Sequence, residues 1–286
     1  MEKIIVLGST GNIGKAVLKY LKGKNVDVYA GIQSDEHSDL INRYGATPII
    51  ADFTNQIDVN KALQDKDRVF LVTPIMQNPE QVTEKVVNAA KINGVKHFVR
   101  STAAGADSRG TIQLSRWAGA SENVLKSSGL NYTIIRPYTF LQNFIHFHGF
   151  SIKHHNAFYL PVGNAKTSYV DVDNIGEVIA TVLTSSEYFG KTIELSGFEY
   201  THTELAELLS NVLNRTISFI DVPENEARNA MITNNYPEWL TNALMELNYA
   251  TKQGFLAGFS PVYKTITGKE YTRASRFFTD NKSVFM

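Results

Sequence analysis

The sequence predicts an α/β protein with a doubly wound parallel sheet and a smaller, mostly helical C-terminal lobe. Two observations carry this prediction. The stretch GSTGNIG, from Gly8 to Gly14, separates a short apolar, β-branched run from a segment whose apolar residues recur at helical spacing. Strand-like and helix-like segments then alternate steadily through the first half of the chain, and this order favours parallel strands joined by right-handed crossovers.

Each predicted strand is a short apolar segment bounded by amphipathic stretches. The first five cover residues 4–7, 26–32, 48–51, 68–73 and 97–101, and two more lie in NYTIIRPYTFLQNF and KTIELSG. With helices on both faces of such a sheet, the loops that bind ligands gather at the carboxyl ends of the strands.

The last third of the chain is predicted to be mostly helical. Thr201 or Thr203 is placed to cap a helix in which leucines repeat at helical spacing, and helical patterns continue from about residue 224. We therefore expect residues 1–150, with strands that return at about 165–200, to form the sheet domain. Residues 201–286 are expected to form most of the lobe, with a cleft between the two parts.

The composition is that of an ordinary globular protein of 286 residues. Lys plus Arg and Asp plus Glu number 28 each, so no net charge attracts nucleic acid or a membrane surface. The absence of cysteine excludes a disulfide framework, a thiolate nucleophile and a cysteine-ligated metal, and it fits a reducing compartment. The chain starts with a predicted strand and has no stretch of about 18 apolar residues, so we expect a cytoplasmic protein.

The glycine turn at residues 8–14 predicts a phosphate site. A turn between a strand and a helix aims the N–H groups of the first helical turn at one spot, where the helix dipole adds about half a positive charge. Gly8 permits the tight turn, Gly11 the close approach of a pyrophosphate, and Gly14 the packing of the helix on its strand. These roles indicate a Rossmann-type dinucleotide domain, and an ordinary glycine-rich turn is the alternative.

Segments beyond the glycine turn follow, in order, those of a known family. GSTGNIG is followed by GATPIIADFTN, FLVTP, GVKHFVRST, NYTIIRPYTFLQN and YVDVDNIGEVIATVL. Together these segments, which span most of the chain, resemble the NmrA-like group of atypical short-chain dehydrogenase/reductases, which includes NAD(P)H-dependent quinone and dye reductases. The resemblance implies a Rossmann-type domain that binds a nicotinamide cofactor, with a small C-terminal substrate lobe.

Carried over position by position, the resemblance implies cofactor contacts at the carboxyl ends of the predicted strands. They are Gly8, Ser9, Thr10, Gly11, Asn12, Ile13 and Gly14 at the phosphates, Asp52 and Phe53 at the adenine, Thr73 and Pro74 along the ribose and linker, Ser101 and Thr102 near the nicotinamide, and Pro137, Tyr138, Phe140 and Asn143 in a loop that touches nicotinamide or substrate in relatives. Two alternatives stay open. Asp52 would instead cap the following helix, and Tyr138 and Phe140 would instead belong to the core of the lobe.

The end of the second predicted strand favours NADP(H) over NAD(H). An NAD site usually has a carboxylate here and an NADP site an arginine, whereas the segment AGIQSDE puts Gln33 where the family often has arginine. Asp35 and Glu36 come late for the acidic role and are expected to start the next helix. Gln33 does not repel a 2′-phosphate, although Gln33 and Ser34 would tolerate both forms.

The helix after the fifth predicted strand lacks the proton-transfer pair of most short-chain dehydrogenases. The pair is a tyrosine and a lysine four residues later, and the resemblance places Ala118 and Glu122 at these positions. Hydride transfer to an electron-poor quinone or dye needs less help, because protonation can come from water. The candidate catalytic residues are Tyr138, Asn143 and Glu122, and the alternative for Glu122 is a solvated helix residue. The aromatic walls of the acceptor site would be Tyr138, Phe140 and Trp117.

No metal site is predicted. The four histidines of HFHGFSIKHH, between His146 and His155, have spacings that share no single helical face, and we expect them at the rim of the cleft. Asp171 and Asp173 are interpreted as turn and helix-cap residues, with Asp173 directly before a helical pattern.

The expected function is an NAD(P)H-dependent oxidoreductase that passes hydride to a small quinone-like or aromatic acceptor, with no nucleic-acid or membrane partner. The alternative is a redox sensor that binds the dinucleotide and a protein partner without turnover, which the missing tyrosine and lysine favour. A sugar-nucleotide epimerase shares the fold but needs that tyrosine, and therefore ranks last. The oligomeric state stays open, with a homodimer as one candidate.

Overall fold

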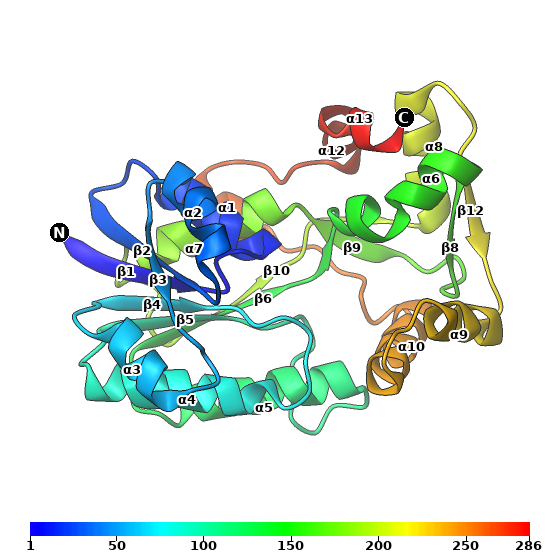
Figure 1. Ribbon diagram of the computed structural model, residues 1–286. Helices are drawn as coiled ribbons and strands as arrows, with labels where there is room; N and C mark the ends of the chain where they lie inside the picture. Colours follow the sequence, from blue (N-terminus) through cyan, green and yellow to red (C-terminus); the bar gives the residue numbers. More distant parts are fainter.

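The computed structural model describes residues 1–286 and contains a central parallel sheet of seven strands (Figure 1). The strands are β1 (Glu2–Leu7), β2 (Val26–Ile32), β3 (Thr47–Ile50), β4 (Arg68–Leu71), β5 (His97–Ser101), β6 (Tyr132–Pro137) and β10 (Thr192–Leu195). They lie in the order β10-β6-β5-β4-β1-β2-β3, and every neighbouring pair is parallel. The predicted doubly wound α/β fold is confirmed. The strand order reverses between β1 and β4, which is where such sheets bind their ligands.

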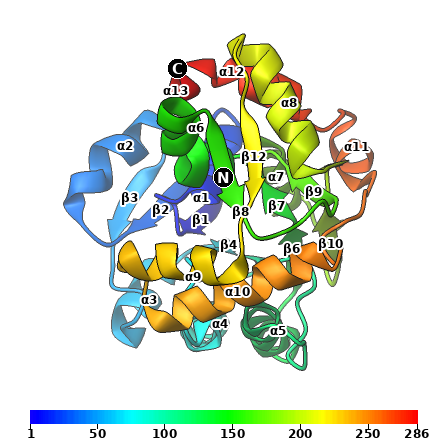
Figure 2. The ribbon, with the colours of Figure 1, turned by 90° about the vertical axis from the view of Figure 1, so that its right-hand side faces the viewer.

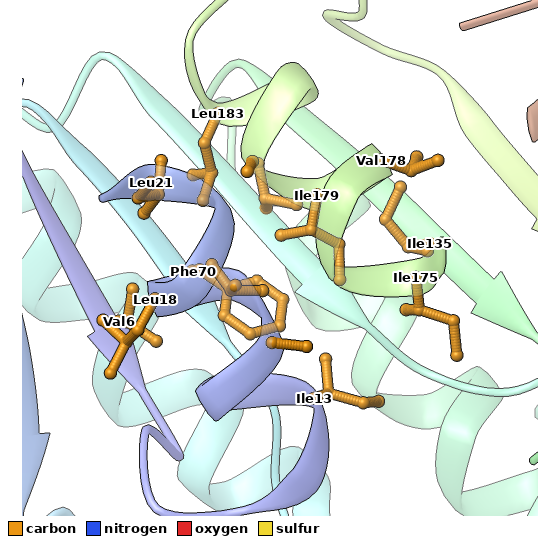
Figure 3. Close-up of a cluster of buried hydrophobic side chains, with 14 of the residues drawn as sticks. Val6, Ile13, Leu18, Leu21, Phe70, Ile135, Ile175, Val178, Ile179 and Leu183 are labelled. Atoms are coloured by element: carbon orange, nitrogen blue, oxygen red, sulfur yellow. The ribbon is translucent and has the colours of Figure 1, made fainter. Parts of the chain in front are cut away.

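Helices cover both faces of this sheet (Figure 1). On one face lie α1 (Asn12–Leu21), α2 (Ser38–Arg43) and α7 (Val172–Leu183), and on the other α3 (Gln56–Leu63), α4 (Pro79–Ile92) and α5 (Gln113–Lys126). The larger core cluster lies between the sheet, α1 and α7, and includes Phe70, Leu18 and Ile179 (Figure 3). The apolar residues that recur at helical spacing in α1 and α7 are the ones that this core buries.

The helices α1 and α7 approach each other closely because small residues lie where they cross. A Cβ atom at Gly176 of α7 would lie 2.5 Å from the Cβ atom of Ala16 of α1 and 2.6 Å from its carbonyl carbon. Only glycine fits this position, and the contact sets how α1 lies on the sheet.

A second part of the molecule lies beyond the carboxyl edge of the sheet (Figures 1 and 2). Its strands are β7 (Thr139–Phe140), β9 (Thr167–Val170) and β11 (Phe198–Tyr200) in one small sheet, and β8 (Ala157–Leu160) and β12 (Ser218–Asp221) in another. Its helices are α6 (Gly149–His155), α8 (His202–Leu213), α9 (Glu224–Thr233), α10 (Glu238–Lys252), α12 (Ala274–Asp280) and α13 (Lys282–Phe285). The chain after residue 224 is mostly helical, as predicted.

The core of this second part draws on two regions of the chain. Leu141, Phe144 and Phe158 come from the region before α7, and Leu209 and Phe278 from the region after α8 begins. In Figure 2, α6, α8, α12 and α13 lie in the upper part of the view and α9 and α10 in the lower part, with α6 and α8 flanking the β8–β12 pair. No helix of the chain combines the length and the apolar character that a membrane span requires.

The start of α8 is set by a reciprocal cap. The hydroxyl of Thr201 accepts from the backbone N–H of Glu204 at 3.1 Å, and the Glu204 carboxylate accepts from the backbone N–H of Thr201 at 2.7 Å. Thr201, and not Thr203, is therefore the cap.

One predicted cap, Asp173, and one open alternative, Asp52 as a cap, are wrong. Asp171 caps α7 by accepting from the backbone N–H of Asp173 at 3.0 Å, so Asp173 lies inside the first turn and is not the cap. Asn55 caps α3 through the backbone N–H of Ile57 at 2.9 Å, so Asp52 is not the cap of that helix. In both places the side chain that reaches the free N–H groups is not the one that the local pattern indicated.

Crowding at the α1–α7 crossing makes a direct prediction. The Gly176→Ala variant should lose about 1 to 3 kcal/mol of unfolding free energy, because the new methyl group has no room. Urea denaturation measures this loss. Gly149→Ala in α6 is the matched control, since a Cβ atom there would have only ordinary contacts at 3.6 Å, and it should leave the stability unchanged or slightly raised. Equal losses in both variants would contradict the role of the crossing.

His97 at the start of β5 is fully buried. Its Nε2 lies 2.8 Å from Oγ1 of Thr133, and the Thr133 hydroxyl itself donates to the carbonyl oxygen of Tyr188 at 2.6 Å. Nε2 is therefore the protonated nitrogen, and Nδ1 has neither proton nor partner. Burial, with a smaller effect of Arg68, lowers the pKa of His97 to about 3.

This burial makes stability depend on pH. Between the ordinary pKa of 6.5 and the folded pKa of about 3, His97 takes up a proton only when the chain unfolds. Its contribution is complete above pH 6.5 and is lost as the pH falls toward 3. His97→Gln removes the uptake of up to about one proton on unfolding. The slope of unfolding free energy against pH should therefore fall by up to about 1 kcal/mol per pH unit. Denaturation curves from neutral to mildly acidic pH measure both slopes, and identical slopes would refute the prediction.

Candidate functional site

The glycine turn between β1 and α1 lies at the carboxyl edge of the sheet, where the strand order reverses. Gly8 has a φ of +82°, and a Cβ atom there would lie 2.3 Å from the carbonyl oxygen of Val72. A Cβ atom at Gly14 would lie 2.1 Å from the carbonyl oxygen of Gly8. Contacts within the chain therefore require glycine at Gly8 and Gly14.

Gly11 is different, because its missing side chain faces open space. The nearest atom to a Cβ there would be the carbonyl oxygen of Gly8 at 3.5 Å, an ordinary contact. Gly11 is also the N-cap of α1, which has no side-chain cap and no acidic residue in its first turn. The helices α4, α5, α9 and α10 also have no side-chain cap, so the feature that distinguishes α1 is the open approach at Gly11. An open approach to uncapped N–H groups fits an anionic ligand such as a diphosphate.

The end of β2 lies beside this turn. Ser9 is fully buried and its Oγ donates to the carbonyl oxygen of Gly31 at 2.7 Å, so this side chain ties the turn to β2. The ring of Phe53 covers Gly31, since a Cβ atom there would lie 2.3 Å from the Cζ atom of the ring. Gln33 is exposed just beyond the strand. The acidic residues that follow start the short helix η1 (Asp35–His37), as predicted.

Polar groups also follow β3 and β4. The carboxylate of Asp52 accepts from the Thr54 hydroxyl at 2.7 Å and from the Thr54 backbone N–H at 2.8 Å, and these bonds lower the pKa of Asp52. Thr73 is half-buried and Pro74 is exposed beside it.

Arg100 in β5 is a buried charge beneath this edge. It is 2% exposed, and it donates to Oγ1 of Thr73 at 2.9 Å and to the carbonyl oxygen of Leu71 at 3.2 Å. Its Nε has no partner, and burial lowers the pKa of Arg100 to about 10. Our reading of the sequence missed Arg100, although a charged residue inside an apolar strand was a usable signal.

Glu122 of α5 is 1% exposed, and both of its carboxylate oxygens have partners. Oε1 accepts from the Thr102 hydroxyl and from Nε of Arg136, each at 2.8 Å, and Oε2 accepts from Nη2 of Arg136 at 2.7 Å and from Lys126 at 2.9 Å. Burial raises the pKa of Glu122, but the bonds from Arg136, Lys126 and Thr102 outweigh it and hold the pKa below its ordinary value. The alternative of a solvated helix residue is wrong: Glu122 is an ionised buried group that joins α5 to β6 and to the end of β5.

The three aromatic residues expected around the acceptor lie in different surroundings. Tyr138 donates its backbone N–H to the carbonyl oxygen of Leu195 at 3.0 Å, and burial raises the pKa of its phenol. Phe140 packs against the core cluster of α1 and α7. Trp117 meets Trp239 of α10 edge-on, with 5.8 Å between ring centroids. Trp117 therefore joins α5 to the second part of the molecule.

A cavity of about 600 Å³ lies in the second part, next to the loop that follows β6. Of its 25 lining residues, 14 are hydrophobic, a composition and size typical of small-molecule sites. Thr139 and Asn143, which follow β6, belong to its lining, so Asn143, one of the predicted residues, reaches this cavity. The other walls come from the π-helical turn η2 (Phe144–His148) and from β8, β9, α9 and α10.

A buried polar pair belongs to the cavity wall. The hydroxyl of Tyr169 lies 3.0 Å from Nε2 of His202, and the two residues are 4% and 2% exposed. Burial raises the pKa of Tyr169 and lowers the pKa of His202 to about 4. His148 also lines the cavity, and burial and the nearby His202 lower its pKa to about 4. All three side chains are therefore uncharged at neutral pH.

Sequence reasoning did not find Tyr169 or His202. They meet only after folding, and His202 carries no local signal beyond its place at the start of a capped helix. Among the four histidines of residues 146–155, His148 alone lines the cavity. No three His, Asp or Glu side chains gather closely enough to hold a metal ion.

A protein-family model matches residues 1–275, which include the glycine turn, Glu122, the loop after β6 and the cavity. The description of that model is the NmrA-like family. The chain belongs to the NmrA-like family. The predicted resemblance is confirmed.

Known relatives of this NmrA-like protein match over most of its length. An NAD(P)H azoreductase from Xenophilus azovorans is 28% identical over 283 residues, with 99% of each chain covered. Quinone oxidoreductase 2 from Escherichia coli is 24% identical over 275 residues, covering 94% of this chain and 95% of that one. An NADPH complex of an E. coli NADPH-dependent quinone oxidoreductase superposes with a TM-score of 0.88 at 22% identity, covering 98% of this chain and 99% of the other.

The Glu122–Arg136 pair makes a stability prediction for this NmrA-like protein. Glu122→Ala should lose about 3 kcal/mol of unfolding free energy, because it removes the buried carboxylate that contacts the largely buried Arg136 at 2.7 Å and leaves only the more exposed Glu194, at 3.3 Å, to pair with it. The control is Lys126→Ala, which removes the more exposed partner of the same carboxylate and should cost less than about 1 kcal/mol. Urea denaturation measures both, and a small loss in Glu122→Ala would contradict the prediction.

Proposed function

We propose that this protein is an NAD(P)H-dependent reductase that transfers hydride to a small quinone-like or other aromatic acceptor. The observation that carries the proposal is a mainly apolar cavity whose wall includes Thr139 and Asn143, in the chain segment that follows β6 at the same carboxyl edge of the sheet as the glycine turn. The names of the azoreductase and quinone oxidoreductase relatives support the same reaction class.

The residues at the strand edge fit a nicotinamide dinucleotide. Gly11 leaves its backbone open and the N-terminus of α1 has no cap, so this end would hold the diphosphate. Bound there, the cofactor supplies the hydride. The other proposed contacts are Ser9, Thr10, Asn12 and Ile13 in the turn, Gln33, Asp52 and Phe53 toward the adenosine, Thr73 and Pro74 along the linker, and Ser101, Thr102, Pro137, Tyr138 and Phe140 toward the nicotinamide.

The chain's own part in the reaction is orientation. Glu122 is ionised and saturated with hydrogen bonds, so it acts as a positioning residue for Thr102 and not as a proton donor. Asn143 in the cavity wall is placed to donate a hydrogen bond to an oxygen or nitrogen of the acceptor. An electron-poor acceptor stabilises the incoming charge, and water supplies the proton.

A steady-state assay with NADPH and simple quinones tests the proposal. We expect cofactor oxidation that saturates with quinone, and a rise in KM for Asn143→Ala. Cofactor binding with no oxidation by any quinone or azo acceptor would defeat the proposal. It would favour a redox sensor, the alternative that an ionised Glu122 and the alanine at position 118 support.

We further propose NADPH as the preferred cofactor, because no carboxylate occupies the exposed position of Gln33 at the end of β2. Gln33→Asp should weaken NADPH binding by about tenfold or more, through repulsion of the 2′-phosphate, and should leave NADH binding unchanged or tighter. Calorimetric titration of the wild type and of Gln33→Asp with NADPH and with NADH measures the change in cofactor preference. The same Kd ratio in wild type and variant would place the ribose elsewhere.

A further inference from the structure

Formal charge is nearly absent from the cavity wall. None of the 25 lining residues is a lysine or an arginine, and Glu226 is the one acidic residue among them. Glu226 is exposed, at the rim. His148 and His202 have pKa values of about 4 because they are buried, so neither is a cation at neutral pH.

The helix α9 turns apolar side chains toward the cavity. It contains no buried residue, yet Ala227, Ala230 and Met231 line the cavity on one side. The helix is attached to α10 through polar surface contacts, a hydrogen bond from Arg228 to Asn242 at 2.8 Å and an ion pair between Glu224 and Lys252 at 3.3 Å. An apolar face turned toward an apolar chamber favours an apolar occupant.

We propose that this cavity selects its acceptor by charge, admitting uncharged aromatic molecules and rejecting those that carry a sulfonate or carboxylate. The inference rests on the proposed reductase function and names its substrate class. An anion that enters the cavity loses its hydration, and no cationic side chain lines the cavity to compensate for that loss. The carboxylate of Glu226 at the rim also repels an anion. An uncharged ring loses no such hydration and buries apolar surface.

Two fluorescent probes that differ by one sulfonate test the selection without turnover. N-phenyl-1-naphthylamine is uncharged, and 8-anilinonaphthalene-1-sulfonate is the same molecule with a sulfonate added. In titrations of the intact protein near neutral pH, the uncharged probe should bind about tenfold or more tightly than the sulfonate. Equal dissociation constants would overturn the proposal.

A matched pair of variants separates charge selection from general hydrophobicity. Ala230 and Asn229 are both exposed neighbours on α9, and of the two only Ala230 lines the cavity. Ala230→Lys therefore adds a cation to the cavity face, and Asn229→Lys adds the same cation beside it. Ala230→Lys should reduce the ratio of the two dissociation constants about tenfold, mainly by tighter sulfonate binding, and Asn229→Lys should leave it near the wild-type value. Equal shifts in both variants, or no shift in Ala230→Lys, would refute the proposal.

Turnover separates this inference from the proposed function. With NADPH, 1,4-naphthoquinone should have a kcat/KM at least about tenfold above that of 1,4-naphthoquinone-2-sulfonate, and the difference should lie in KM. Equal values would overturn charge selection and leave the reductase function intact. Probe selectivity without oxidation of NADPH by either quinone would overturn the reductase function, and the cavity would still select by charge.

Discussion

The turn at Gly8–Gly14 holds β1, β4 and α1 at separations that no side chain permits. Gly8 lies against the backbone of Val72 beyond β4, and Gly14 lies against the carbonyl of Gly8. These two contacts fix where α1 begins. Its N-terminus therefore lies at the carboxyl edge of the sheet, and the backbone of Gly11 there is open to a ligand. The close crossing of α1 with α7 at Gly176 holds the helix in that position. The proposed phosphate site is thus a product of steric limits within the chain.

The strand β6 connects this edge to the cavity. Arg136 near its end is held by Glu122 of α5, and the chain then passes through Tyr138 into β7 and the cavity wall at Asn143. The same carboxylate of Glu122 holds Thr102 beyond β5. One buried ion pair therefore aligns the ends of two neighbouring strands where the two proposed ligands would meet, which gives it a role in geometry beyond its contribution to stability.

The sheet was predictable from the sequence because its signals are local. The bounds of β2 and β5 agree with the predicted ones, since each strand is an apolar run ended by turn residues. The caps at Asp171 and Asn55 were missed because several polar side chains compete for the same free N–H groups, and only the backbone path decides between them. The burial of Glu122 depends on Arg136, a residue on another element, so the common surface fate of glutamate was the wrong guide. A cleft between the two parts was expected, but the cavity lies in the second part, and its walls could not be assigned because they come from residues about 100 positions apart.

The helix α9 faces the cavity and, unlike its neighbour α10, has no buried residue. Residues that are not buried in a core tolerate replacement with little loss of stability. Substitutions at Ala227, Ala230 and Met231 would therefore change which molecules bind in the cavity and leave the stability of the Rossmann sheet unchanged. A change of acceptor therefore does not require a change in the residues that stabilise the fold. We expect proteins of this architecture that use different acceptors to differ most in α9.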